Sequence, residues 1–500
     1  MNREINIGAA PDREAVDAAT GNSLTDLSAV EAIAAMRAGD IKAEDYARAL
    51  LDRASALESL NVFRSLNAER VLEAARATDL ARASGAALGM LHGLPIPVKD
   101  SVNTRALPTS NGTCALRDFK PGKDAAVLKP LCDQGAILMG KTNLHELSRG
   151  WTSNNGAFGA VRNPYDFDRI PGGSSGGSGV AVAARIAPLA IAADTWGSIR
   201  VPAALCGIAG LRPTFGRYPG AGIMPLTADK FDQVGPLARS VADLALFDTV
   251  VTGDAMPLSA TWLSGVRIGV SPAYFFAGLD VDVERIAREA LAKLEAAGAT
   301  LVWAEILEAA RVAPRIATAI IGYENVAAIS SFLEAEAAGL RFPQILEDAS
   351  PDIIATYRQA AITRDAYETA LQKRGQLKIA IREHFETHAI DVLAFPPVLS
   401  PAPLVGEDRE TEIRGEKIPL GKVMGRNTAL ASCASLASLV LPAGLASSGL
   451  PVGLEFDALP GRDRALLSLG LSLENALGKI AAPRIKAVGP RYSIVSKVKS

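Results

Sequence analysis

Lys99 stands in the apolar segment PIPVKD, where a charged side chain is out of character. Lysine is rarely buried in full unless it has a partner or a role. Burial disfavours the charged amine and lowers its pKa, so a buried lysine can act as a general base near neutral pH. An ion pair with the adjacent Asp100, or with a more distant acid, accounts for Lys99 equally well. The sequence leaves both interpretations open.

Residues 171–179 read PGGSSGGSG, two serines set between pairs of glycines. A flexible linker is one interpretation of this composition. A phosphate loop needs a lysine after its glycines and a dinucleotide-binding turn needs another glycine spacing, so neither pattern is met. The G-x-S-x-G pattern of α/β-hydrolases fits both Ser174 and Ser175. That fold also needs a preceding strand and a suitable downstream histidine. The poor strand NPYDFDRIP and the charged setting of the two downstream histidines disfavour it.

Ser198 lies just after the apolar segment PLAIAAD (188–194), which is typical of a strand, and stands at the start of a helical pattern. Backbone N–H groups converge at a strand-to-helix turn and suit the binding of an oxyanion. Serine is also a common N-cap in such a place. Ser198 is therefore either part of an oxyanion-binding turn or an ordinary helix cap.

The segment HFETH offers His384 and His388 one helical turn apart. The zinc-protease helix has glutamate directly after the first histidine, whereas Glu386 comes two residues after it and points off the shared face. A solvated helix face explains the segment better. We interpret His92 and His145 as structural, and we expect neither a metal site nor a cofactor.

The hydrophobic content predicts a large apolar core, and the charge balance indicates no strongly charged binding partner. Of the 500 residues 49% are hydrophobic, and the net charge is −2 with both signs mixed along the chain. No basic face indicates nucleic acid. The four cysteines lie far apart without CxxC spacing, which predicts buried free thiols in a reducing compartment. The N-terminus has no signal region and no long apolar stretch is uninterrupted, so we expect a cytoplasmic protein that binds no membrane.

The elements that must position these residues follow from apolar periodicity. Helices are predicted at 28–39, 43–59, 67–85, 124–134, 177–187, 201–207, 281–297 and through most of 308–388. Strands are predicted within 94–104, 136–143, 188–194, 266–271, 299–305, 392–399, 438–444 and 451–456. The charged stretch 406–417 is predicted to be an exposed loop or hairpin.

Strands that alternate with helices favour a largely parallel sheet covered on both faces. We find no internal repeat and no linker rich enough in glycine, proline or serine to separate domains. We therefore predict an α/β protein with a flexible tail over residues 1–22 and a single α/β/α domain over 23–500. Its central sheet is expected to be mixed, mostly parallel and twisted.

Several sequence blocks, taken together and in order, resemble the amidase signature family. They are LHGLPIPVKDSVNT (91–104), GKTNLHEL (140–147), SNNGAFGAVRNP (153–164), PGGSSGGSG, DTWGSIRVPAALCGIAGLRPTFGRYP (194–219) and SLVLPAGLASSGLPVGLEF (438–456). The spacings from Lys99 to Ser174 and from Ser174 to Ser198 are also found in that family. The resemblance covers most of the chain and implies a signature core over about 91–255, with a variable helical pocket region over about 308–420.

The resemblance implies a Ser–cis-Ser–Lys triad in which Ser198 is the nucleophile, Ser174 the bridging serine and Lys99 the base. It also implies a cis peptide bond between Gly173 and Ser174. The oxyanion hole would be four consecutive backbone N–H groups, those of Thr195, Trp196, Gly197 and Ser198. Three further residues would support the loop and the nucleophile turn: Ser175, Asp194 and Arg200.

Trp196 departs from the family pattern, because many members have D-T-G-G-S where this chain has D-T-W-G-S. Tryptophan does not readily adopt a positive φ, so the turn must use an ordinary backbone conformation at this residue or carry strain. The indole ring must pack beneath the turn or form a wall of the pocket.

Within the family, the chain looks most like the indoleacetamide and mandelamide hydrolase branch. The resemblance implies an amidase that converts a small, arylacetamide-type primary amide to a carboxylate and ammonia. Candidate pocket walls are aromatic, with core packing as the alternative role: Trp151, Trp196, Tyr323 and Phe332. The expected partner is a small-molecule amide rather than nucleic acid or a membrane, and a homodimer is left open.

Three rival functions share this resemblance. An esterase, carbamate hydrolase or anilide hydrolase would use the same triad on other bonds. An A-type subunit of a tRNA-dependent amidotransferase would use it together with partner subunits. A binding protein without catalysis would be expected to have lost a triad residue, and Lys99, Ser174 and Ser198 are all present.

Overall fold

The computed structural model describes residues 23–336 and 338–485, so the predicted tail at 1–22 lies outside the described residues. Its centre is a sheet of eleven described strands in the order β1-β3-β2-β4-β6-β5-β12-β13-β9-β7-β8. These strands are β1 (Phe63–Leu66), β2 (Pro95–Lys99), β3 (Ile137–Thr142), β4 (Leu189–Asp194), β5 (Ala209–Arg212), β6 (Gln233–Ala238), β7 (Arg267–Val270), β8 (Thr300–Trp303), β9 (Val392–Phe395), β12 (Ala437–Leu445) and β13 (Pro451–Ala458).

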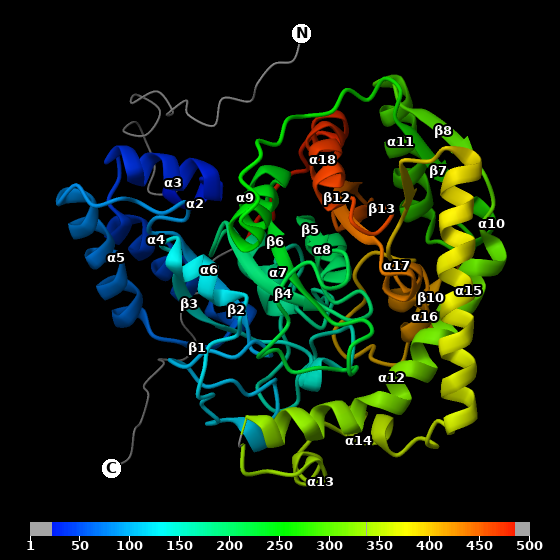
Figure 1. Cartoon of the computed structure of the whole chain (residues 1–500), viewed down its shortest axis with the longest axis horizontal. Helices are drawn as coiled ribbons and strands as arrows, with labels where there is room; N and C mark the ends of the chain where they lie inside the picture. Colours follow the sequence, from blue (N-terminus) through cyan, green and yellow to red (C-terminus); the bar gives the residue numbers. More distant parts are fainter. Residues whose placement is uncertain (1–22, 337, 486–500) are drawn as a thin grey trace.

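Helices cover both faces of this sheet (Figure 1). The described helices before β7 are α2 (Ser23–Asp26), α3 (Ala29–Ala38), α4 (Ala43–Ala56), α5 (Ala68–Ala83), α6 (Leu128–Asp133), α7 (Gly176–Ala183), α8 (Arg200–Cys206) and α9 (Val241–Thr252). The described helices after it are α10 (Pro272–Phe275), α11 (Val281–Ala296), α12 (Leu307–Ala335), α13 (Phe342–Ile345), α14 (Pro351–Tyr357), α15 (Arg364–His388), α16 (Leu420–Gly425), α17 (Ala429–Ala434) and α18 (Asp463–Leu477). The α/β architecture predicted from the sequence is confirmed.

The predicted predominance of parallel strands is wrong. The sheet is mixed, and six of the ten neighbouring pairs among its described strands are antiparallel. Parallel strands need a crossover connection, usually a helix. A loop without any described helix joins β5 to β6, and a short turn joins β12 to β13, so these strands pair antiparallel. The alternating strands and helices to either side do form parallel pairs, β2 with β3 and β4, and β7 with β8 and β9.

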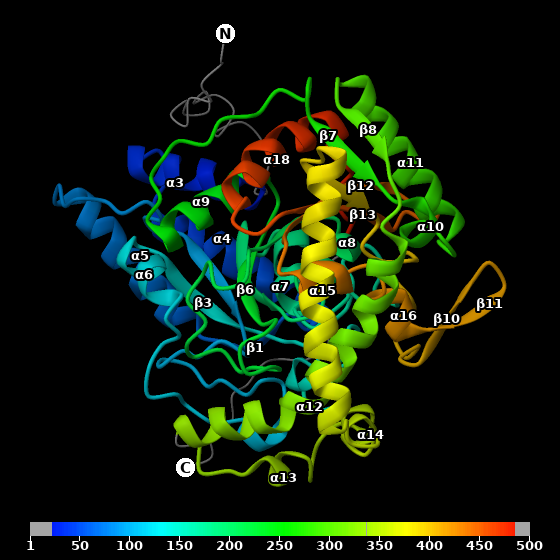
Figure 2. The ribbon, with the colours of Figure 1, turned by 45° about the vertical axis from the view of Figure 1, so that its right-hand side comes forward.

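Local signals placed most helices correctly. Ser28 caps α3 through a capping box with Glu31, and Gly39 ends this helix with a φ of 83°. The stretch 308–388 is mostly helical, and α12 and α15 lie side by side (Figure 2). The strand predicted at 392–399 ends at Phe395, because Pro396 and Pro397 follow it and cannot donate to a sheet.

A two-stranded hairpin, β10 (Glu410–Ile413) with β11 (Glu416–Pro419), projects from the body of the protein (Figure 2). It confirms the hairpin interpretation of 406–417. Its two turn residues, Arg414 and Gly415, have φ values of 54° and 82°, as the tight turns of hairpins require.

The structure also bears on two expectations from the sequence, that the cysteines are buried free thiols and that no segment spans a membrane. Cys114, Cys132, Cys206 and Cys433 are all free, but only Cys206 and Cys433 are buried. One described helix, α12, is long and apolar enough to cross a membrane by length and composition. Half of its most apolar window is buried, and it packs on α15 and α17.

Candidate active site

The site begins where two parallel strands end side by side. β2 and β4 are neighbours, so their carboxyl ends meet at one edge of the sheet. Lys99 is the last residue of β2 and Asp194 the last of β4. Both strands are almost wholly buried, which explains their nearly continuous apolar sequences. The fold thus brings the ends of two core strands to the loop that precedes α7.

Lys99 is buried, and its Nζ lies 2.7 Å from Oγ of Ser174 and 3.4 Å from the carbonyl oxygen of Ala193. Burial lowers the pKa of Lys99 to about 7, although the negative charges of Asp194 and Asp232 act against this shift. The alternative that Lys99 pairs with Asp100 is wrong, because the Asp100 carboxylate lies 3.3 Å from Nζ of Lys141. A lysine that is half neutral near pH 7 therefore contacts a buried serine.

The glycine–serine segment is buried along its whole length, so the linker interpretation is wrong. The peptide bond between Gly173 and Ser174 is cis, as the resemblance implied. A Cβ on Gly176 would lie 2.3 Å from Oγ of Ser153, and one on Gly177 would lie 2.4 Å from a backbone oxygen. These glycines are needed because another backbone segment at Gly177, and the side chain of Ser153 at Gly176, approach this loop too closely for a side chain.

The turn after β4 is organised around the Asp194 carboxylate. It accepts hydrogen bonds from the N–H groups of Gly197 (2.8 Å) and Ile199 (3.0 Å), and lies 3.1 Å from Nε of Arg200 and 2.9 Å from Nη1 of Arg212. Burial alone would raise the pKa of Asp194, but the two guanidinium groups hold it well below its usual range. Asp194 and Arg200 thus take the supporting positions predicted, whereas Arg212 was missed.

Arg212 gave the same signal as Lys99, a charged residue at the end of an apolar strand, and it could have been found in that way.

The turn also answers the question that Trp196 raised. The positive φ of the turn falls on Gly197, at 91°, and Trp196 is not among the residues with positive φ. The resemblance implied that the N–H of Gly197 belongs to the oxyanion hole. In the structure this N–H already donates to the Asp194 carboxylate, so it is not free to bind an oxyanion. Within residues 23–336 and 338–485, no hydrogen-bond acceptor contacts the N–H groups of Thr195, Trp196 or Ser198. These three donors of the turn remain available.

Ser198 and Ser174 lie on adjacent loops. Ser175 joins these loops, since its N–H donates to the carbonyl oxygen of Ser198 at 3.3 Å and its Oγ donates to that of Ala193 at 3.0 Å. In the described part of the chain, no hydrogen bond links Oγ of Ser198 to Oγ of Ser174. Catalytic contacts are often long before substrate binds and tighten in the complex.

Ser198 opens into a cavity of about 40 Å³. Its lining residues are Ser148, Arg149, Gly150, Trp151, Trp196, Ser198, Leu226 and Ile321. The two indoles meet edge to face with ring centroids 5.4 Å apart. Nε1 of Trp151 donates to the carbonyl oxygen of Trp196 at 2.8 Å, and Nε1 of Trp196 donates to that of Gly425 at 2.7 Å. Trp196 is therefore a hydrogen-bonded wall of the cavity.

Comparison with known proteins agrees with this geometry. The model of the family described as Amidase matches residues 45–467. The chain belongs to the amidase signature family. It is 34% identical to the indoleacetamide hydrolase of Agrobacterium vitis, with 92% of this chain and 98% of that protein covered. It is 33% identical to the mandelamide hydrolase of Pseudomonas putida, with 97% of this chain and 99% of that protein covered. The crystal structure of the peptide amidase from Stenotrophomonas maltophilia superposes on this structure with a TM-score of 0.80. The two chains are 28% identical, and 93% of this chain and 99% of that chain are covered. The protein is an amide-hydrolysing enzyme.

Two of the four predicted pocket residues do not reach the cavity of this amidase. Ile321 of α12 lines it, and Tyr323 is two residues further, about 200° around the helix. The Tyr323 ring instead stacks on Tyr367, with centroids 4.2 Å apart. Phe332 faces the same way as Ile321 but lies about 16 Å further along the axis, where it packs on a second apolar cluster near α13.

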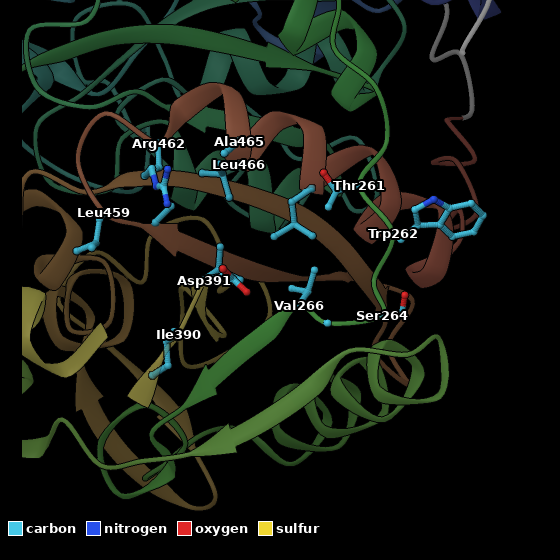
Figure 3. Close-up of a pocket in the computed structure, with 14 residues that line it drawn as sticks. Thr261, Trp262, Ser264, Val266, Ile390, Asp391, Leu459, Arg462, Ala465 and Leu466 are labelled. Atoms are coloured by element: carbon cyan, nitrogen blue, oxygen red, sulfur yellow. The ribbon is translucent and has the colours of Figure 1, made fainter. Parts of the chain in front are cut away.

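A larger cavity of the amidase, about 410 Å³, lies away from this site, between the starts of β7 and β9 and α18 (Figure 3). Asp391, Arg462 and the exposed Trp262 are among its lining residues, and none of the three predicted triad residues is. Among the described residues, no group of three or more His, Cys, Asp or Glu side chains could hold a metal ion. His92 and His145 are buried, and the rings of His384 and His388 lie 4.8 Å apart.

Proposed function

We propose that this amidase hydrolyses a small primary amide through an acyl-enzyme on Ser198, with Ser174 as proton relay and Lys99 as general base. The observation that carries the proposal is the contact of 2.7 Å between Ser174 and a lysine whose pKa is lowered to about 7. Serine is a weak nucleophile unless an adjacent base takes its proton. Lys99 supplies that base where the described site places no histidine.

The proton and electron steps follow from this arrangement. Neutral Lys99 takes the proton of Ser174 as Ser174 takes that of Ser198, and Oγ of Ser198 attacks the carbonyl carbon. The oxyanion is stabilised by the N–H groups of Thr195, Trp196 and Ser198. The relay then runs in reverse, protonates the leaving nitrogen and releases ammonia as the C–N bond breaks. Water repeats the cycle on the acyl-enzyme and releases the carboxylate.

We propose an arylacetamide-type acyl group. Its support is the likeness to enzymes named indoleacetamide and mandelamide hydrolase, and a cavity walled by Trp151 and Trp196 with the aliphatic Leu226 and Ile321. Aromatic rings stack and meet edge to face favourably with such walls. The cavity of about 40 Å³ holds roughly three water molecules, so a ring enters only if the indoles shift. We also propose that the enzyme works in the cytoplasm on a free small molecule, without a cofactor, and forms a homodimer.

The test measures kcat/KM over primary amides, anilides, esters and carbamates for the native enzyme and for Ser198→Ala. We expect Ser198→Ala to lose at least a thousandfold on every substrate, because removing a nucleophile in such a unit removes most of the catalysis. Ser259→Ala, in an exposed loop, is the matched control and should keep full activity. Mass spectrometry of quenched reactions should find the acyl group on Ser198. Retained activity in Ser198→Ala, or acylation elsewhere, contradicts the mechanism, and faster turnover of esters or carbamates contradicts the substrate class.

A further inference from the structure

Arg149 is a charged residue of the cavity that the proposed mechanism does not use. It lines the same cavity of about 40 Å³ as Ser198, beside Trp151 and Trp196. Its side chain is partly buried, and its Nε is inaccessible to solvent and makes no hydrogen bond. Across residues 23–336 and 338–485, no carboxylate forms an ion pair with Arg149 and no oxygen accepts a hydrogen bond from its guanidinium group. The guanidinium group is therefore a set of N–H donors, one of them inaccessible to solvent, without an acceptor in the described part of the chain.

Two fully buried arginines of the protein, by contrast, have carboxylate partners. Arg200 lies 3.1 Å from Asp194 and 2.6 Å from Glu455, and Arg212 lies 2.9 Å from Asp194. Their charges are compensated within the fold. A desolvated charge without a partner is costly, and folded proteins pair such groups or use them to bind ligands. Arg149 therefore has room for a partner that the chain itself does not provide.

The surroundings of Arg149 agree with an external anion as that partner. Burial lowers the pKa of Arg149, and the phenol of Tyr357 is the group that acts against this shift. Burial raises the pKa of Tyr357 to about 12, so its phenol stays neutral, donates to Asn325 and does not neutralise the guanidinium. The remaining walls of the cavity are small, hydroxyl, aromatic or aliphatic: Ser148, Gly150, Trp151, Trp196, Ser198, Leu226 and Ile321.

We propose that Arg149 binds a carboxylate of the substrate, so that the preferred substrate is a primary amide carrying a carboxylate a few atoms from the amide carbon. This inference rests on the proposed function of Ser198. A guanidinium group offers parallel N–H donors that match a carboxylate in a bidentate geometry. Because Arg149 and Ser198 line one cavity with space for about three water molecules, the two substrate groups must be close together. A half-amide of a short dicarboxylic acid has this chemistry, and so does an arylacetamide with a carboxylate on its ring.

The test compares matched pairs of amides with and without a carboxylate: succinamate with butyramide, and 3-carboxyphenylacetamide with phenylacetamide. The quantity measured is the ratio of kcat/KM for the anionic amide to that for its neutral partner. A hydrogen-bonded ion pair in a partly buried site predicts a ratio of about 10 to 100 in at least one pair for the native enzyme. Arg149→Gln should bring this ratio to about 1 or below, and Arg149→Lys should restore part of it.

Arg462→Gln is the matched control, because Arg462 lines the distant cavity of Figure 3 and its removal should leave the ratio unchanged. A melting temperature for each variant identifies loss of fold, which would change both members of a pair equally. A native ratio near 1 in both pairs, or a ratio that Arg149→Gln does not alter, overturns the inference while the acyl-enzyme on Ser198 still stands. Failure of Ser198→Ala to abolish turnover would instead overturn the proposed function.

Discussion

The protonation of Lys99 gives the sharpest prediction about catalysis. Only the neutral amine can accept a proton, so activity should rise with pH as Lys99 loses its charge. Burial places that change at a pKa of about 7. An ordinary lysine has a pKa of about 10.4, and at pH 7 only about 0.04% of it would be neutral. Burial of Lys99 therefore raises the neutral fraction at pH 7 to about one half, roughly a thousandfold.

The pH profile of kcat/KM should follow this fraction. Below pH 7 we expect a fall of about tenfold per pH unit, to roughly one tenth of the maximum at pH 6 and one hundredth at pH 5. Acid unfolding driven by the protonation of Lys99 does not explain such a loss of activity. Below pH 7 Lys99 is protonated in both the folded and the unfolded chain, so it makes no pH-dependent contribution to stability there. Between pH 7 and about 10.4 the unfolded chain binds more protons, and the Lys99 contribution to stability rises with pH.

The assay uses a neutral substrate such as phenylacetamide, which does not titrate in this range. Asp232→Asn provides the perturbation, because the charge of Asp232 raises the pKa of Lys99. Its removal should move the acid limb of the profile to lower pH. Asp229→Asn, at a side chain that is 70% exposed and does not act on Lys99, is the matched control and should leave the limb in place.

Two outcomes would refute this reasoning about Lys99. An apparent pKa below about 5 or above about 9 would mean that another group controls the acid limb. An acid limb that Asp232→Asn moves to higher pH would have the wrong sign, because removing a negative charge disfavours the protonated amine.

Two further predictions concern the walls of the cavity and the turn. Gly425→Ala should lower kcat/KM, measured with phenylacetamide, about tenfold or more, because the added Cβ would lie 3.0 Å from Cζ2 of Trp151 and displace this wall. Gly421→Ala is the control and should be tolerated, because its Cβ would lie 3.6 Å from the same ring. Asp194→Asn should lower the free energy of unfolding by about 3–5 kcal/mol in urea denaturation, since it leaves two buried guanidinium groups without this carboxylate, whereas Asp229→Asn should have little effect.

The sequence predicted those parts of the site that are carried by unusual residues in local context. Lys99 was recognisable because a lysine does not belong in a buried apolar strand. The glycines around Ser174 were recognisable because so many adjacent glycines indicate close backbone approach, and the structure places other backbone within 2.4 Å of a Cβ at Gly177. Both signals come from residues whose types conflict with their surroundings.

Contacts between distant segments could not be predicted in this way. Asp232 reaches the nucleophile turn because β4 pairs antiparallel with β6, with Asp194 opposite Gln233. Periodicity reports whether a segment is a strand but not which strand lies beside it. The same limit explains why the sheet was expected to be mostly parallel. Tyr323 was misplaced because its side of α12 depends on how that helix packs on the site.

Asp194 connects the geometry of the turn at Ser198 to the charge of Lys99, the proposed base. Its carboxylate holds the N–H of Gly197, which fixes the turn that presents Ser198. The same negative charge favours a protonated Lys99 and would oppose catalysis if it stood alone. Arg200 and Arg212 lie on this carboxylate and carry the opposite charge, and the effect of burial on the pKa of Lys99 exceeds that of Asp194. In the mechanism that we propose, the two buried arginines would allow this carboxylate to hold the turn without keeping Lys99 charged.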